Sequence, residues 1–249
     1  MRHTFRYLVP SAPDAGAEVV LSADDAHHLV RVVRRGPGDA VELIDPDGRL
    51  WPARVVRTAP DVAVRVAAGE APAEAPAATV TLYLGLAEWG RVDTAVEKAV
   101  ELGAGEVVVF TSERARRVPE PDAWRRRRER LQRVAEAAAR QSGRGPLRRV
   151  RGLLAFDEVT AEIPSGEGFL IDPRGDAPLT SAIRPGGGAA ARASLVVGPD
   201  SGFSEAEVAR ARTAGLAVAH LGPAVLRAET AAIAAVTIAA SGGWGGADA

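Results

Sequence analysis

The segment LGPAVLRAETAAIAA, Leu221–Ala235, directly continues a short apolar run, LAVAHL. It turns at a Gly-Pro pair and places Arg227, Glu229 and Thr230 before a run of small residues typical of a helix. Proteins of the α/β class build ligand sites where a strand passes into a helix, and three hydrogen-bonding side chains within four positions suit that role. The alternative is an ordinary helix start, in which Glu229 and Thr230 only cap exposed N–H groups.

A second Gly-Pro loop, GPDSG at Gly198–Gly202, follows another apolar strand, SLVVG. Glycine lets the backbone approach a ligand closely, so that main-chain N–H and C=O groups can read it. Neither loop has the GxGxxG pattern of dinucleotide sites, and GPDSG lacks the GK[ST] of a P-loop. The pair therefore favours a cofactor recognised by backbone edges rather than by phosphate anchors, the alternative being two tight turns.

The composition is typical of a soluble globular protein of one large or two modest domains. The 249 residues are 47% hydrophobic and 25% charged, and no apolar run approaches the length of a membrane span. The first residues lack the apolar core and cleavage site of a signal peptide. Cysteine is absent and the four histidines show no metal-binding spacing, so we expect a cytoplasmic protein without a metal.

Arginine is unevenly distributed along the chain. The formal net charge is −1 and Lys98 is the single lysine, yet basic residues far outnumber acidic ones between Arg114 and Arg151. Such a local basic surface can bind a phosphate backbone, which predicts contact with RNA. The alternative is a solvated helix face.

Residues 1–70 read as a β-rich module, because short β-branched runs (VELID, ARVVRTA, VAVRVAA) alternate with the turn signals GPGD and DPDG. One helix is predicted over Asp24–Arg34, with Ser22 as its N-cap and Gly36-Pro37 as its stop. The Pro/Ala-rich stretch GEAPAEAPAA contains too few large apolar residues to pack, so a linker is expected at residues 71–78.

Strand and helix patterns alternate over residues 79–249, which predicts a mostly parallel sheet with helices on both faces. The pattern RVDTAVEKAVELG predicts a helix that ends at Gly103, followed by a long helix at Asp122–Gln141 and a short one at Phe156–Glu162. Ser204 is the expected N-cap of a later helix, EAEVARARTAG, and the final GGWGGADA reads as a frayed tail.

Several of these pieces resemble one family. RVDTAVEKAVELG, the TSER loop, RQSGR, GPDSGFS and LGPAVLRAETA are similar to motifs of the 16S ribosomal RNA uracil-N3 methyltransferases of the SPOUT (trefoil-knot) superfamily. HHLVRVVRRGPGD is similar to the PUA-like RNA-binding domain of that family, so the resemblance covers nearly the whole chain.

The resemblance implies a PUA-like domain at residues 1–70 and a trefoil-knotted α/β methyltransferase domain at 79–249. It also implies homodimers, with S-adenosylmethionine held by the knot loops Leu170–Arg174, Gly198–Gly202 and Leu221–Leu226 and the site closed by Arg227–Ala231. The expected cofactor-binding residues are Leu170, Asp172, Val197, Gly198, Pro199, Asp200, Gly202, Leu221, Gly222, Val225, Leu226, Thr230 and Ala231.

The resemblance further implies the substrate, small-subunit ribosomal RNA, and the catalytic candidates. We expect Arg227 to stabilise the negative charge that develops on the base, and Glu229 to act as general base or to orient Arg227. The expected RNA contacts are Arg2, Arg6, Arg31, Arg34, Arg35, Arg91, Arg114, Arg117, Arg140 and Arg144.

This chain departs from the family pattern at three places. Asp200-Ser201 stands where Glu-Gly is usual, which would strain Ser201 if that position requires a positive φ. Arg91 replaces a common lysine, and Ala224 an arginine that is often present. Two other functions remain open from the sequence: a SPOUT methyltransferase acting on another RNA such as tRNA, and a ribosome-assembly RNA-binding protein without catalysis.

Overall fold

The computed structural model describes residues 5–45, 49–68, 73–74, 80–115, 118–142, 149–183 and 192–241. The chain separates into two units, each with its own dense internal packing. The first comprises residues 1–77 with 139–146, and the second comprises residues 78–138 with 147–249.

The first unit is built on a six-stranded sheet in the order β1-β3-β4-β5-β2, with β6 paired to β4. The strands are β1 (Phe5–Leu8), β2 (Glu18–Val20), β3 (Ala40–Ile44), β4 (Arg49–Arg57), β5 (Ala63–Val66) and β6 (Ala73–Glu74). Only β1 and β3 run parallel. Tyr7, Leu29 and Leu43 lie in its buried core. The β-rich character is confirmed, but the predicted linker is not wholly irregular, because β6 falls within it.

The predicted helix of the first unit is shorter and wider than expected. Ser22 does cap it, but α1 (Ala23–His27) passes into a π-helical turn, η1 (His28–Val32), and the chain then leaves the helix. Arg34 adopts a left-handed φ of 53°. The predicted extension to Arg34 is wrong. The three valines of LVRVV lower α-helical propensity here, and the wider turn keeps Leu29 fully buried while Val32 is 60% exposed.

The second unit contains a seven-stranded sheet in the order β11-β13-β10-β12-β7-β8-β9. Every neighbouring pair in it is parallel, so the predicted parallel sheet is confirmed. Its strands are β7 (Val80–Gly85), β8 (Ala104–Thr111), β9 (Arg149–Ala155), β10 (Gly168–Ile171), β11 (Ala177–Pro178), β12 (Ala193–Val197) and β13 (Ala217–His220). The central strands are buried on both faces, which accounts for their continuous apolar runs.

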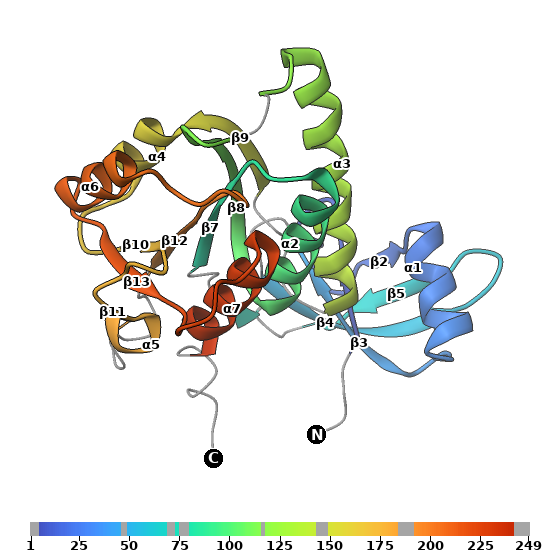
Figure 1. The fold of residues 1–249 in the computed structure, drawn as a ribbon. Helices are drawn as coiled ribbons and strands as arrows, with labels where there is room; N and C mark the ends of the chain where they lie inside the picture. The colour runs from blue at the N-terminus through green and yellow to red at the C-terminus, as the bar shows by residue number, and fades with distance from the viewer. Residues whose placement is uncertain are drawn as a thin grey trace. The chain divides into compact units, whose positions relative to one another are not determined.

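Helices cover both faces of this sheet, as predicted. The helices are α2 (Trp89–Leu102), α3 (Pro121–Ser142), α4 (Phe156–Glu162), α5 (Leu179–Ala182), α6 (Glu205–Thr213) and α7 (Ala228–Ser241). Helices α2 and α7 lie side by side against β7, β8 and β12 (Figure 1). On the opposite face, α4 and α6 bury Phe156, Val159 and Val208 against the alternate side chains of the strands.

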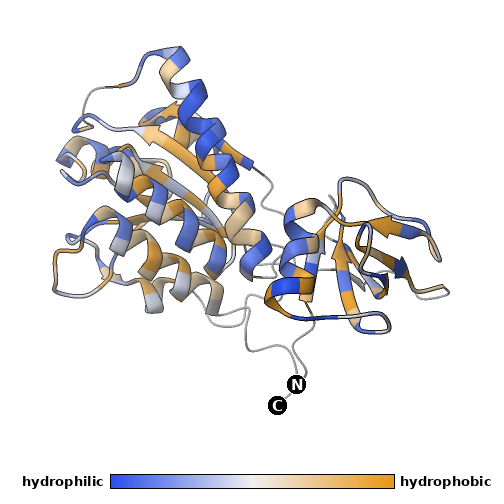
Figure 2. Ribbon diagram, turned by 90° about the vertical axis from the view of Figure 1, so that its right-hand side faces the viewer, coloured by the Kyte–Doolittle hydropathy of each residue, from blue (hydrophilic) through white to orange (hydrophobic). Residues whose placement is uncertain are grey.

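The helix boundaries follow the local signals that the sequence carries. Gly103 ends α2 with a left-handed φ of 117°, and Ser204 forms a capping box with Glu207 at the start of α6. Figure 2 shows the apolar strands of the sheet and the largely hydrophilic outer side of α3. Arg125, Arg126 and Arg128, which belong to the basic stretch of the sequence, are exposed on α3.

The connection between β10 and β11 crosses over another strand. Ile171 of β10 and Ala177 of β11 both pair with Ala219, so β13 lies between two strands that only five residues connect. Gly175 is the residue that makes this crossing possible, because a Cβ there would lie 2.4 Å from the carbonyl carbon of Ala219. A strand that passes beneath so short a connection is threaded, which is the local feature of a knotted chain.

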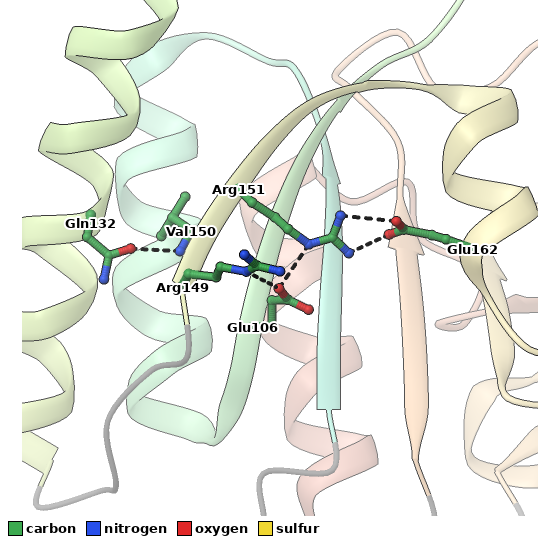
Figure 3. A network of polar contacts seen from close by, with 6 residues as sticks. All are labelled: Glu106, Gln132, Arg149, Val150, Arg151 and Glu162. Atoms are coloured by element: carbon green, nitrogen blue, oxygen red, sulfur yellow. Dashed lines mark hydrogen bonds and ion pairs between the residues drawn. The ribbon is translucent and has the colours of Figure 1, made fainter. Parts of the chain in front are cut away.

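A network of polar side chains links β9 to β8, α4 and α3 (Figure 3). Arg151 bridges Glu106 at 2.9 Å and Glu162 at 2.6 Å, and Gln132 of α3 accepts a 2.8 Å hydrogen bond from the N–H of Val150. The hydrogen bond to Glu162 is the main reason that the pKa of Arg151 is raised. Gln132 thus satisfies one backbone N–H of β9, an edge strand whose free groups could otherwise pair with another chain.

Candidate functional site

A cavity of about 350 Å³ opens at the carboxyl ends of β10, β12 and β13. Because parallel strands point the same way, the loops that follow them meet at one edge of the sheet. The loops are Asp172–Arg174, Gly198–Phe203 and Leu221–Leu226, and the first turns of α7 complete the wall. The three segments that the sequence indicated as a cofactor site therefore come together in space.

Eleven of the thirteen predicted cofactor-binding residues line this cavity: Asp172, Val197, Gly198, Pro199, Asp200, Gly202, Leu221, Gly222, Val225, Leu226 and Ala231. Leu170 does not, because its side chain faces the buried core under α4 and α6, whereas its neighbour Ile171 lines the cavity. Thr230 is exposed on α7, where the positions that line the cavity are three residues apart, Ala228 and Ala231. Neither side chain is part of the cavity wall, so the cofactor-binding role of Leu170 and of Thr230 stays a prediction.

Other lining residues were not among the predicted cofactor ligands: Arg114, Ile171, Pro173, Arg174, Ser201, Phe203, Ala224 and Ala228. Arg114 lies on a loop that is far away in the sequence, and was expected to contact RNA. Phe203 belongs to the core, where it stacks on Phe110 at 6.3 Å, so its place in the cavity wall leaves no local sequence signal.

Two glycines beside the cavity, Gly85 and Gly198, let neighbouring atoms approach the main chain closely. A Cβ on Gly85, at the end of β7, would lie 2.5 Å from the nitrogen of Pro199. A Cβ on Gly198 would lie 3.0 Å from the ring of Phe203. These close approaches bring the main chain of the Gly198–Phe203 loop to the cavity wall, as the prediction of recognition by backbone edges requires.

An ion pair between the exposed Arg174 and the buried Asp172 stabilises the loop after β10. Asp172 is 3% exposed, and Arg174 donates to its two carboxylate oxygens at 2.7 and 2.8 Å. The same guanidinium donates to the carbonyl of Phe203 at 3.0 Å, which joins this loop to the next one. Burial acts to raise the pKa of Asp172, but the hydrogen bonds from Arg174 hold it below its ordinary value.

Arg91, at the first turn of α2, forms an ion pair with Asp200 of the GPDSG loop. This hydrogen bond is the main cause of the raised pKa of Arg91, to which the charge of Glu229 also contributes. The Oε2 atom of Glu229 is buried without a hydrogen-bond partner in the described part of the chain. Arg91, a predicted RNA contact, is thus paired with Asp200 of the cavity wall. It also lies near Glu229, whose Oε2 atom accepts no hydrogen bond from the described residues.

Arg227 and Glu229 do not line the cavity themselves, but their neighbours Leu226 and Ala228 do. Arg227 is exposed, and its carbonyl accepts the first hydrogen bond of α7, from Ala231 at 2.8 Å. Within the described residues, no acidic side chain pairs with its guanidinium. The two predicted catalytic residues therefore occupy the rim of the cavity at the start of a helix.

The TSER loop, which follows β8, is tied to the GPDSG loop. The hydroxyl of Ser201 donates to the carbonyl of Arg114 at 2.6 Å, and Arg114 donates to the carbonyl of Ser201 at 3.3 Å. The carboxylate of Glu207 accepts from the N–H groups of Glu113 and Ser204, both at 2.8 Å. The strain anticipated at Ser201 is absent, because the residue of this loop with a positive φ is Gly202, at 66°.

A second cavity of about 270 Å³ adjoins the first. Its walls are Leu86, Ala87, Arg114, Pro199, Asp200 and Ser201, and the last four of these also line the larger cavity. Nothing in the sequence indicated this cavity, because Leu86 and Ala87 read as the continuation of a buried strand.

The predicted RNA contacts of the first unit fall into two groups. Arg6 forms an ion pair with Glu42 at 2.7 Å, and Arg35 lies 3.6 Å from Asp39. Arg31 and Arg34 are exposed, as is Arg140 near the end of α3. The predicted contacts Arg2, Arg117 and Arg144 lie outside the described residues, as does the tail GGWGGADA.

The described residues contain neither a candidate metal site nor a helix that could span a membrane. His, Asp and Glu do not gather there into a group of three that could hold a metal ion. The helices of the same segments include none that is both long and apolar enough to cross a membrane.

Family comparisons match both units. A family model described as an RNA methyltransferase domain matches residues 73–240, and one described as an RNA methyltransferase PUA domain matches residues 21–61. The fold and its loop-lined cavity are thus those of an RNA methyltransferase with a PUA domain, and the predicted SPOUT fold class is confirmed.

Similar proteins define the family more closely. A ribosomal RNA small subunit methyltransferase E of Mycobacterium bovis is 32% identical over 240 residues, covering 92% of this chain and 88% of the relative. A crystal structure of a protein of the same name from Neisseria gonorrhoeae, bound to S-adenosyl methionine, has a TM-score of 0.73 at 26% identity, with 94% and 95% of the two chains covered. A probable rRNA-methyltransferase from Porphyromonas gingivalis has a TM-score of 0.71 at 27% identity, with 93% and 94% covered. The chain belongs to the ribosomal RNA small subunit methyltransferase E family.

Proposed function

We propose that this protein transfers a methyl group from S-adenosylmethionine to N3 of a specific uridine in small-subunit (16S) ribosomal RNA. The observation that carries the proposal is the cavity formed by the three loops after β10, β12 and β13. It lies in a chain whose family includes a structure with bound S-adenosyl methionine.

The lining of the cavity suits this cofactor. Leu221, Val225, Leu226 and Phe203 offer apolar surface for an adenosine, and the glycine-containing loops bring main-chain N–H and C=O groups to its edges. Arg114 and Arg174 are the cations of the wall, and because Arg174 already pairs with Asp172, Arg114 is the one that can bind a carboxylate. A volume of about 350 Å³ lies at the lower end of the range for small-molecule sites.

The bound cofactor supplies an activated methyl group, and the remaining work falls to residues at the rim of the cavity. Uracil N3 carries a proton and is a poor nucleophile while neutral, so charge must be stabilised on O2 and O4 as the proton leaves. Arg227 is exposed and without an acidic partner in the described part of the chain, so its guanidinium is available for that role.

Glu229 is our candidate for accepting the N3 proton. Its Oε2 atom is buried and has no hydrogen-bond partner among the described residues, a state that a donor on the substrate would relieve. Arg91 lies close enough for the charge of Glu229 to affect it, which keeps a cation beside the carboxylate when no substrate is present. In an alternative role, the carboxylate orients Arg227.

The RNA is held by arginines of both units. In the second unit, Arg126, Arg128 and Arg133 are exposed on α3 and pair with no acidic side chain among the described residues, so they form a basic face. In the first unit, the PUA domain contributes exposed arginines at Arg31 and Arg34. We further propose that the protein is a cytoplasmic homodimer that acts on RNA within the small ribosomal subunit.

Mass-spectrometric mapping of modified nucleosides in 16S rRNA tests the proposal. Cells that lack the protein should lose one N3-methyluridine, and expression of the wild-type chain should restore it. An unchanged map refutes the assignment, and loss of a modification in tRNA instead supports the other SPOUT function. Calorimetry with S-adenosylmethionine separates an enzyme from a ribosome-assembly binding protein, which has no reason to bind the cofactor.

A further inference from the structure

Three consecutive residues of the GPDSG loop are held by three different segments of the second unit. Pro199 packs closely against the end of β7. Asp200 forms its ion pair with Arg91 of α2. Ser201 exchanges hydrogen bonds with Arg114 of the TSER loop. Because Pro199, Asp200 and Ser201 all line the larger cavity, these three anchors set the shape of its wall.

The anchor at Asp200 joins two opposite charges. The side chains of Arg91 and Asp200 are 31% and 26% exposed, so most of the surface of the pair is shielded from water. A fully exposed ion pair contributes little to holding a loop, whereas a shielded pair is screened less by salt. Without Arg91, the carboxylate of Asp200 would keep its charge at the cavity wall and lose the contact that holds it in place.

Two further carboxylates lie near Arg91 and interact with it more weakly. Its Nε atom is 4.0 Å from Glu88, whose side chain is 58% exposed. Glu229 of α7 acts on the guanidinium through its charge, and the hydrogen bond to Asp200 remains the largest cause of the raised pKa of Arg91. Acidic groups thus neutralise this arginine locally, which disfavours a contact with an RNA phosphate.

We propose that Arg91 is a positioning residue for the cofactor, which holds the GPDSG loop through Asp200, and that it is not an RNA contact. The proposal rests on the proposed methyltransferase function and deepens it. It also links two of the departures from the family pattern, because arginine in place of lysine and aspartate in place of glutamate meet in one ion pair. Arginine is one bond longer than lysine and aspartate one bond shorter than glutamate, so both combinations span the same distance.

The affinity for S-adenosylmethionine, measured by calorimetry without RNA, tests the proposal. Arg91→Met should weaken binding about 10-fold in the wild-type background. In the Asp200→Ala background the same change should weaken it by less than about 2-fold, because the contact is already lost. The control is Arg130→Met, which breaks the ion pair between Asp93 of the same helix and α3, away from both cavities. It should bind the cofactor as the wild type does.

Exchanging the lengths of the two side chains gives a second test. Arg91→Lys alone should bind S-adenosylmethionine about 5-fold more weakly, because the shorter side chain does not reach Asp200. The double variant Arg91→Lys/Asp200→Glu should return to within about 2-fold of the wild type. Filter binding of small ribosomal subunits without the cofactor should give the same affinity, within about 2-fold, for Arg91→Met and the wild type.

Three results would overturn the proposal. The first is a further 10-fold loss from Arg91→Met in the Asp200→Ala background, since the two residues would then act independently. The second is a failure of the length-exchanged pair to restore binding. The third is wild-type cofactor affinity in Arg91→Met together with weaker binding of small subunits, which would make Arg91 an RNA contact. A wild-type protein that binds no S-adenosylmethionine refutes the proposed function instead, before any variant is compared.

Discussion

The hydroxyl of Ser201 donates a 2.6 Å hydrogen bond to the carbonyl of Arg114, and so joins two loops that are 87 positions apart. Both residues line the larger cavity, and the guanidinium of Arg114 returns a hydrogen bond to the carbonyl of Ser201. Ser201 stands where glycine is usual in the family that the motifs resemble, so this chain has added a side-chain contact at its cavity wall.

We expect Ser201→Ala to weaken cofactor binding about 5-fold, because one hydrogen bond contributes about 1 kcal/mol to holding the TSER loop. Calorimetry with S-adenosylmethionine measures this change. Ser181→Ala, on the exposed side of α5, provides a matched control and should bind as the wild type does. Equal affinities for all three proteins would mean that the contact has no part in shaping the cavity.

Gly175→Ala should destabilise the second unit by about 2–4 kcal/mol, because the added Cβ would meet the backbone of Ala219 at 2.4 Å. Denaturant unfolding gives the free energy. Gly36→Ala has no atom within 4 Å of its new methyl group and should leave stability within about 0.5 kcal/mol of the wild type. If Gly175→Ala were equally stable, the crossing over β13 would not be as tight as described.

Arg227→Ala should lower the rate of methyl transfer by about 100- to 1,000-fold, since it removes the charge that stabilises the deprotonated base. The melting temperature should not change, because the side chain is exposed and makes no ion pair within the described residues. Single-turnover methylation of small subunits measures the effect. Arg192→Ala, at another exposed arginine, serves as control, and a similar rate for both variants would exclude Arg227 from catalysis.

Arg126 and Arg128 are both exposed on α3. Reversing their charges should weaken the binding of RNA by a similar factor whatever the RNA sequence. Each lost phosphate contact should reduce the slope of log affinity against log salt by about 0.7–0.9. Filter binding across a salt series reports the slope. The control is Arg212→Glu on α6, where the arginine already pairs with Asp176. An unaltered slope in the double variant would mean that α3 is only a solvated face.

The two tyrosines of the chain, Tyr7 and Tyr83, should resist ionisation in the folded protein. Burial, with the charge of Asp25, raises the pKa of Tyr7 to about 12, and burial, with the hydrogen bond that the Tyr83 hydroxyl donates to Glu162, raises that of Tyr83. Folding raises the pKa of both tyrosines. Their contribution to the free energy of unfolding is therefore fully present below pH about 10 and is lost as the pH rises above that value. Tyrosinate absorbance should therefore appear above pH about 10, together with unfolding; a transition near 10 in folded protein would contradict this.

Local signals in the sequence located most elements of the second unit. Ser204, Gly103 and the β-branched runs of the strands marked helix ends and strands correctly, because capping and side-chain periodicity act within a few residues. The short elements β11 and α5 were missed, since two or four residues carry too little pattern. In the first unit, the helix ends at Val32 rather than Arg34, where packing of Leu29 outweighs helical periodicity.

The class of the fold and the three cavity-forming loops could be read from the sequence, two loops from Gly-Pro turns after apolar strands and Leu170–Arg174 from the family resemblance, because turns and motifs are local properties of the chain. Only the tertiary structure decided which side chains face the cavity. Leu170 turns into the core while Ile171 does not, and Arg114 arrives from 87 positions away to meet Ser201. The adjoining smaller cavity depends on the packing of Gly85 against Pro199, a contact between distant segments that no local pattern encodes.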